Sequence, residues 1–245
     1  MYDRTDVGEL APPTEGLDTD RPFLRLLHQA HKLDRLSPDV LVEIRRRYMA
    51  MISRADSLVG ELVSGIQERG IWDQTALFVL SDHGNYAGDY GVPAKWWTGM
   101  EDALLRVPLV ARIPGQRNRG VSSELVQHID INQTIHDLAG VKRAHPTSSR
   151  SLMPLLMDNA PGGPHREVVL ASAGHWLGQE HPLDLDRSLF RTLEDRDHLY
   201  YPWKRVIEDH PEASCRTFCI RDTWWKYVWR MNGSEELYDT REAPL

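Results

Sequence analysis

The stretch of sequence that decides the fold is ALFVLSDHG at residues 76–84, followed by NYAGDYGVPAK at residues 85–95. Its first five residues form an uninterrupted apolar run, which is typical of a strand buried on both faces of a parallel sheet. In open α/β sheets, ligands bind beyond the carboxyl ends of the strands. Here that end carries a carboxylate, an imidazole and a glycine, so we expect the functional site there.

A long amphipathic helix is predicted ahead of this strand, over residues 38–69. Ser37 is a capping residue, Pro38 takes the first helical position, and Gly70 closes a run of apolar residues spaced three and four apart. A second apolar run at residues 107–113 predicts another strand. We expect the two strands to be neighbours in one sheet, with the helix packed on its face.

The chain is expected to divide near residue 160. Residues 1–160 are predicted to form part of an α/β domain, in which Asp130 caps a helix that ends at Gly140. Residues 161–245 are predicted to form a loop region and a small antiparallel C-terminal subdomain. Within this second part, the polar stretch at 172–213 shows no clear period and is interpreted as a long loop.

The last thirty residues carry the pattern of an antiparallel meander. Asn232-Gly233 separates two β-type runs, which is a strong hairpin signal. Trp225, Tyr227 and Trp229 alternate onto one face of a strand. We expect this aromatic face to be buried and the meander to be an integral part of the fold.

Composition excludes several classes of protein. With 41% hydrophobic residues in 245, the chain can bury a sizeable core, and its net charge of −7 without a long basic run argues against nucleic acid as a partner. No apolar run is long enough to span a bilayer, and the first 22 residues lack the form of a signal peptide. We expect a soluble protein, in the cytoplasm, the periplasm or outside the cell depending on what precedes it. Cys215 and Cys219 are too far apart on one strand for a disulfide.

Three residues of the opening stretch are candidates for chemistry. Asp82 and His83 offer a carboxylate oxygen and an imidazole nitrogen, which are both good ligands for divalent cations. Lys95 lies beyond a loop with three glycines, where its ammonium could return to the same cavity and hold an anion. The residues alone leave an alternative open, in which Asp82 caps the turn, His83 is a hydrogen-bonded structural residue and Lys95 is solvated.

Other histidines are not counted among the candidates. Isolated histidines in polar stretches are usually solvated or satisfied within the core. This interpretation applies to His128, His136, His175 and His198.

Several signatures occur together in the order and spacing seen in sulfatases. They are Tyr48, Asp56 with Val59-Gly60, Ser81-Asp82-His83-Gly84, Gly88-Asp89-Tyr90-Gly91 with Lys95, Glu101 with Arg106-Val107-Pro108-Leu109, His128-Ile129-Asp130 with Thr134 and Leu138-Ala139-Gly140, and Glu236-Leu237-Tyr238-Asp239. Through them the whole chain resembles the C-terminal half of a type I sulfatase, of the alkaline-phosphatase superfamily.

The resemblance implies a fold, a reaction and site residues. The fold would be α/β, a mainly parallel sheet flanked by helices, with a small C-terminal antiparallel sheet. Asp82 and His83 would be two ligands of a divalent cation, usually Ca²⁺, and Lys95 would be a catalytic residue that contacts the sulfate. The reaction would be the hydrolysis of a small-molecule or carbohydrate sulfate ester.

The nucleophile of this family does not occur in the chain. Sulfatases make formylglycine from Cys or Ser in a Cys/Ser-x-Pro-x-Arg motif, and none of the fifteen prolines here has Cys or Ser two residues before it. We therefore expect a fragment that is inactive alone, with formylglycine only in a missing N-terminal half. A phosphonate monoester hydrolase or phosphodiesterase of the same superfamily, and a non-enzymatic remnant domain, remain as alternatives. The oligomeric state stays open.

Overall fold

The structure is a computed structural model, and it describes residues 2–3, 7–11, 22–118, 120–157, 162–178, 196–197 and 201–241. The helices labelled α are α1 (Pro22–His31), α2 (Pro38–Glu68), α3 (Asp102–Leu105), α4 (His128–Ala139), α5 (Met153–Leu156) and α8 (Tyr201–Asp209). Short 3-10 turns are η2 (Leu33–Arg35), η3 (Trp72–Gln74), η4 (Asp89–Gly91) and η6 (Pro211–Ser214). The strands are β1 (Leu77–Leu80), β2 (Leu109–Arg112), β3 (Val169–Ala173), β4 (Thr217–Arg221), β5 (Trp225–Arg230) and β6 (Glu235–Asp239). No helix in the described ranges is both long and apolar enough to cross a membrane.

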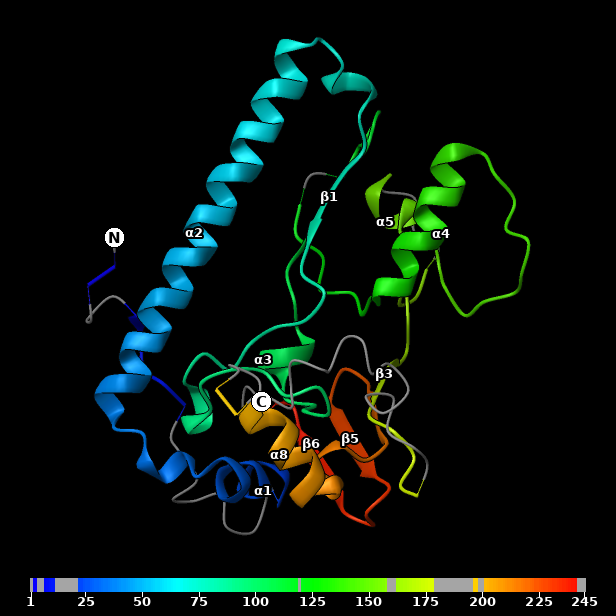
Figure 1. Cartoon of the computed structure of the whole chain (residues 1–245). Helices are drawn as coiled ribbons and strands as arrows, with labels where there is room; N and C mark the ends of the chain where they lie inside the picture. Colours follow the sequence, from blue (N-terminus) through cyan, green and yellow to red (C-terminus); the bar gives the residue numbers. More distant parts are fainter. Residues whose placement is uncertain are drawn as a thin grey trace.

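Helix α2 forms as predicted but does not pack as predicted. It begins at Pro38 behind the extended residue Ser37 and ends at Glu68. Figure 1 shows α2 and β1 diverging from the turn that joins them. Met51 and Leu62, on the apolar stripe of the helix, are 68% and 54% exposed. The expectation that this helix covers the face of the strand pair is therefore wrong.

Strands β1 and β2 are neighbours, as predicted, and they pair antiparallel, with Leu80 opposite Leu109. A mainly parallel sheet is not shown in the described residues. The backbone N–H of Gly84 donates to the Leu104 carbonyl at 2.8 Å, so both ends of the connection lie at the carboxyl end of β1. Strand β2 therefore begins beside the carboxyl end of β1. Its direction is then opposite to that of β1. The predicted burial of β1 on both faces was also wrong, since Leu80 is 40% exposed.

The C-terminal sheet has the strand order β3-β4-β5-β6, and every pair in it is antiparallel. The meander and its turn at Asn232-Gly233 are confirmed. The buried face, however, is the opposite of the predicted one. Lys226, Val228 and Arg230 are buried, whereas Trp225 is 44% exposed.

Ion pairs explain why two charged residues of β5 lie inside. Arg230 Nε donates to Glu236 Oε1 at 3.0 Å, and its Nη1 donates to the Thr98 carbonyl at 2.7 Å. Lys226 Nζ donates to Asp102 Oδ1 at 3.2 Å. A buried charge is tolerated when it is paired and hydrogen-bonded in this way. The contacts to Thr98 and Asp102 also attach the C-terminal sheet to the segment that follows Lys95.

The main apolar core lies between α1, α8 and this same segment. Leu24 and Leu27 of α1, Trp96, and Val206 and Ile207 of α8 belong to one buried cluster. Helix α8 corrects the interpretation of residues 172–213 as a long loop, although 179–195 and 198–200, including His198, lie outside the described residues. Cys215 and Cys219 are free, as predicted. The domain division near residue 160 stays a prediction.

Candidate active site

A tight turn follows directly after β1 and presents the first two candidate residues. Ser81 Oγ donates a hydrogen bond to the His83 carbonyl at 2.7 Å, and the backbone N–H of His83 donates to Asp82 Oδ1 at 3.0 Å. The Asp82 side chain is exposed and that of His83 is only partly buried. The turn therefore holds a carboxylate and an imidazole side by side at the surface.

Gly84 allows the turn to lie close to α3. A Cβ atom at this position would lie 1.9 Å from the backbone oxygen of Ala103, which is far inside van der Waals contact. Every other residue type would therefore push the turn away from α3. The glycine that follows the Asp-His pair is thus required by a close backbone approach.

The structure brings Lys95 to the same place. Lys95 Nζ lies 2.5 Å from His83 Nε2, and His83 Nδ1 lies 2.9 Å from the Gly84 carbonyl oxygen. Because a carbonyl can only accept, Nδ1 carries the proton, and Nε2 uses its lone pair to accept from the ammonium. Asp82 Oδ2 lies 3.5 Å from the same Nε2 atom. The three predicted residues are therefore neighbours, although their roles remain predictions.

The charges around Asp82 favour its ionised form. The pKa of the Asp82 carboxyl group is lowered from its usual value, first by the hydrogen bond from the His83 backbone N–H and then by the nearness of His83 and Lys95. The group is therefore a carboxylate at neutral pH. A carboxylate oxygen beside an imidazole nitrogen is a pair of donors that suits a divalent cation.

The loop between His83 and Lys95 has an unusual backbone that other elements hold in place. Ala87 and Tyr90 adopt positive φ angles of 47° and 56°, a backbone region that residues other than glycine rarely occupy. Arg45 of α2 donates to the Ala87 carbonyl at 2.9 Å and forms an ion pair with Asp89 at 2.6 Å. Such strain persists only where surrounding contacts fix it, and it clusters at functional sites.

The residues after Lys95 are anchored in the core. Trp96 Nε1 and Thr98 Oγ1 both donate to the Ala213 carbonyl, at 2.5 Å and 2.6 Å. Buried Tyr86 donates to Glu101, and burial raises the pKa of this tyrosine well above its usual value. The backbone that carries Lys95 is therefore fixed on one side by η6 and the C-terminal sheet.

His128 also reaches this turn. It is the first residue of α4, and its Nε2 atom lies 2.8 Å from the Ser81 carbonyl oxygen. In the sequence, His128 belongs to a family signature but is not counted among the candidate site residues. The local sequence carries no signal for this contact, because it requires the start of α4 to lie beside the end of β1.

The donors present fit a cation in kind but supply only part of a coordination shell. Among the described residues, no group of three or more His, Cys, Asp or Glu side chains lies together. Asp82 and His83 provide two donors, whereas Ca²⁺ takes about six to eight oxygen ligands. Further donors for such an ion would have to come from elsewhere.

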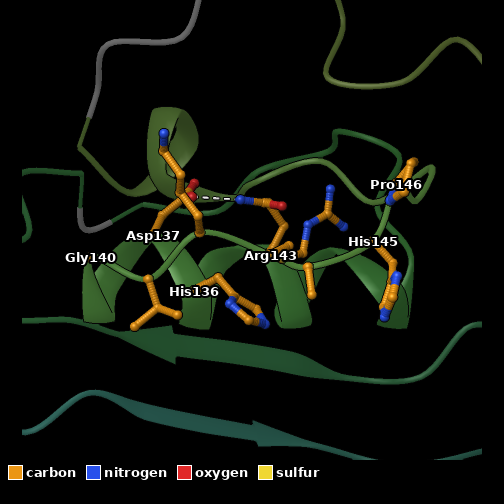
Figure 2. A pocket seen from close by; sticks show the side chains of 10 residues that line it. His136, Asp137, Gly140, Arg143, His145 and Pro146 are labelled. Carbon is orange, nitrogen blue, oxygen red and sulfur yellow. Dashed lines mark hydrogen bonds between the residues drawn. The ribbon is translucent and has the colours of Figure 1, made fainter.

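A surface hollow of about 740 Å³ lies at the other end of α4 (Figure 2). His136 and Asp137 of the helix and Arg143 of the following loop line it, and Asp137 accepts a hydrogen bond from Gln133 at 2.5 Å. None of the three candidate residues lines the hollow. It is therefore separate from the candidate site.

Comparison with known proteins places the chain in a family. Residues 9–141 match the family model named Sulfatase. The multifunctional alkaline phosphatase superfamily protein PehA of Trinickia caryophylli is 31% identical over 195 residues, which cover 76% of this chain and 32% of that protein. Arylsulfatase K of Gallus gallus is 33% identical over 117 residues, which cover 48% of this chain and 22% of that protein.

A solved structure extends the likeness to the fold. The phosphonate monoester hydrolase SpPMH from Silicibacter pomeroyi superposes with a TM-score of 0.74 at 21% identity, over 99% of this chain and 46% of that one. The α/β fold class with a C-terminal antiparallel sheet is confirmed. The chain belongs to the sulfatase family. It spans about a third or less of the length of the curated relatives described above.

Proposed function

We propose that this chain supplies part of the active site of a sulfuric ester hydrolase. In it, Asp82 and His83 bind a divalent cation and Lys95 contacts the sulfate group. The observation that supports the proposal is the convergence of the Asp82 carboxylate, His83 Nε2 and Lys95 Nζ at the end of β1. Membership of the sulfatase family supports the same reaction.

The orientation of the His83 ring, with Nδ1 hydrogen-bonded to a backbone carbonyl, suits a metal ligand. Its Nδ1 atom donates to the Gly84 carbonyl, so the lone pair lies on Nε2, on the side of Asp82 and Lys95. Metal-binding histidines are commonly oriented in this way by a backbone carbonyl on the second ring nitrogen. We propose Ca²⁺ as the ion on the strength of the family resemblance, with its remaining ligands outside the described residues.

Charge stabilisation is the chemistry that these residues offer. Transfer of a sulfuryl group places negative charge on its oxygen atoms, and an ammonium aimed at them stabilises the transition state more than the ground state. The cation, when bound, adds Lewis-acid polarisation of the same group. Because the 245 residues contain no Cys/Ser-x-Pro-x-Arg motif, the formylglycine nucleophile would come from outside them. The substrate is proposed to be a small-molecule or carbohydrate sulfate ester.

The test uses a protein that joins this chain to a segment with the Cys/Ser-x-Pro-x-Arg motif. Asp82→Ala should abolish turnover of an aryl sulfate and reduce bound calcium, because it removes a ligand. Lys95→Ala should lower kcat by about 10²-fold or more and leave the calcium content unchanged, since it removes only transition-state stabilisation. Lys142→Ala, at the hollow beyond α4, is the matched lysine control and should change neither quantity.

Two outcomes would contradict the proposal. Full activity of either variant would remove that residue from the site. Robust hydrolysis of aryl sulfates by the 245-residue chain alone would show that the chain needs no external nucleophile. Initial rates and metal analysis on the same preparations distinguish these cases.

A phosphonate or phosphate ester is the second candidate substrate class. The relative PehA is described as a multifunctional alkaline phosphatase superfamily protein, and a phosphoryl group presents the same anionic oxygens to Lys95. Rates on matched aryl sulfate, phosphate and phosphonate esters separate the two classes. A kcat/KM that is higher for the phosphonate would favour this second candidate.

A further inference from the structure

We propose that His128 is a positioning residue, whose hydrogen bond to the Ser81 carbonyl fixes the turn that carries Asp82 and His83. This inference rests on the proposed function for its consequence in catalysis. The contact itself joins the first residue of α4 to the peptide group directly before Asp82, with Nε2 and oxygen 2.8 Å apart. Because a carbonyl oxygen accepts only, the imidazole donates through Nε2.

The turn needs an external tether on this side. β1 ends its pairing with β2 at Leu80, one residue before Ser81. The hydrogen bonds inside the turn, from Ser81 Oγ and from the His83 N–H, give it a shape but do not fix its place on the molecule. Gly84 is tethered to α3 after the turn. His128 supplies the corresponding tether before Asp82.

The start of α4 is itself rigid, which makes His128 a suitable anchor. Asp130 is completely buried. Its carboxylate accepts hydrogen bonds from the backbone N–H of Gln127 at 2.9 Å and of Arg150 at 2.8 Å. Arg166, itself buried, donates to both oxygens of the same carboxylate. One buried ion pair thus locks the helix end, a neighbouring loop and the position of the His128 backbone.

The consequence concerns how the site residues are directed. A rotation of the Ser81 peptide would change the direction of both following side chains, because Asp82 and His83 share its backbone. The side chains of Asp82 and His83 both lie beside Lys95 Nζ. His128 therefore acts on the site through the backbone, without contact to the cation or to substrate.

Hydrogen exchange in the 245-residue chain tests the contact without any requirement for activity. His128→Ala should speed exchange of the His83 and Gly84 amides about tenfold, as expected for the loss of one hydrogen bond. His128→Gln places an amide nitrogen close to the position of Nε2 and should keep exchange near the wild-type rate. His128→Asn is one bond shorter and should behave like the alanine variant. His136→Ala, in the last turn of the same helix, is the matched control and should leave these amides unchanged.

The outcomes separate this inference from the proposed function. Exchange in His128→Ala or His128→Asn equal to that in His136→Ala would overturn the inference, and so would a failure of glutamine to restore protection. In the joined protein, His128→Ala should weaken calcium binding and lower kcat, with rescue by glutamine. If exchange changes as expected while calcium binding depends on neither His128 nor Asp82, the tether stands and the proposed cation site fails.

Discussion

Two regions of this molecule carry apolar side chains on regular helices or strands, and these side chains reach opposite degrees of burial. In the C-terminal sheet, Val228 is 1% exposed, and the charges of Lys226 and Arg230 beside it are buried and paired. In α2 and the pair β1–β2, by contrast, apolar side chains such as Leu62 and Val110 remain open to solvent.

The difference shows that a periodic pattern predicts which face of an element is apolar but not what covers it. The C-terminal sheet meets the segment after Lys95, which in turn packs with α1 and α8. The C-terminal half of helix α2 extends away from the main core (Figure 1). Contiguous exposed apolar faces are typical of surfaces that contact other parts of a protein or another chain.

Deletion of residues 214–245 should cause the largest loss of stability among the changes proposed for the two regions. It removes three strands of the sheet together with the hydrogen bond from Arg230 to the Thr98 carbonyl and the ion pair between Lys226 and Asp102. Because the segment after Lys95 then loses its contacts with β5, we expect an insoluble chain or one without a cooperative melting transition. Calorimetry and analytical gel filtration measure this. An unchanged transition would mean that the sheet is an independent appendage.

A pair of valine substitutions compares the two regions directly. Val228→Asp places a charge in a buried position and should lower the free energy of unfolding by at least about 3 kcal/mol. Val110→Asp places the same charge on an exposed strand face and should change it by less than about 0.5 kcal/mol. Urea denaturation of both variants provides the values. Equal losses would show that β2 is covered in solution.

Acid sensitivity should depend on the buried carboxylate of α4. Burial by itself raises the pKa of Asp130, but hydrogen bonds from Arg166, Arg150 and Gln127 outweigh it, so that the pKa lies below the usual value. His165, 3.5 Å away, also faces this group. Because the folded pKa is depressed, the stabilisation is present above the unfolded pKa of about 3.9 and is lost as pH falls through the folded value.

The measurement is the free energy of unfolding as a function of pH for the wild type and for Asp130→Asn. The variant should be less stable at neutral pH, because Arg166 then lacks its buried partner. As the pH falls below about 4, the variant should also lose less stability than the wild type, since it has no carboxylate at position 130 to protonate. Parallel curves for the two proteins would show that other groups cause the acid unfolding.

Two glycine substitutions should have smaller effects of opposite sign. Gly84→Ala drives a Cβ atom into the backbone of Ala103 and should destabilise by about 1–3 kcal/mol. Gly60→Ala, in the exposed part of α2, meets nothing within 4 Å and should stabilise by up to about 1 kcal/mol through helix propensity. Thermal unfolding of both variants checks the signs. A loss at Gly60 would indicate that this face of α2 is closely packed.

The sequence by itself determined the elements whose causes are local. Ser37-Pro38 marked the start of α2, the apolar runs marked β1 and β2, and Asn232-Gly233 marked the last hairpin. Capping, fixed proline geometry and side-chain period act within a few residues, so they can be found without a structure. The family signatures also placed Asp82, His83 and Lys95 on the same loop region.

Only the tertiary structure decided features that depend on contacts between distant segments. The tether between Gly84 and Leu104 made β1 and β2 antiparallel, and partners from other segments turned Lys226 and Arg230 inward. Helix α8 formed in a stretch without a clear period, because its two buried residues pack against the main core. The contact of His128 with Ser81 joins residues 47 apart in sequence, so no local pattern could predict it.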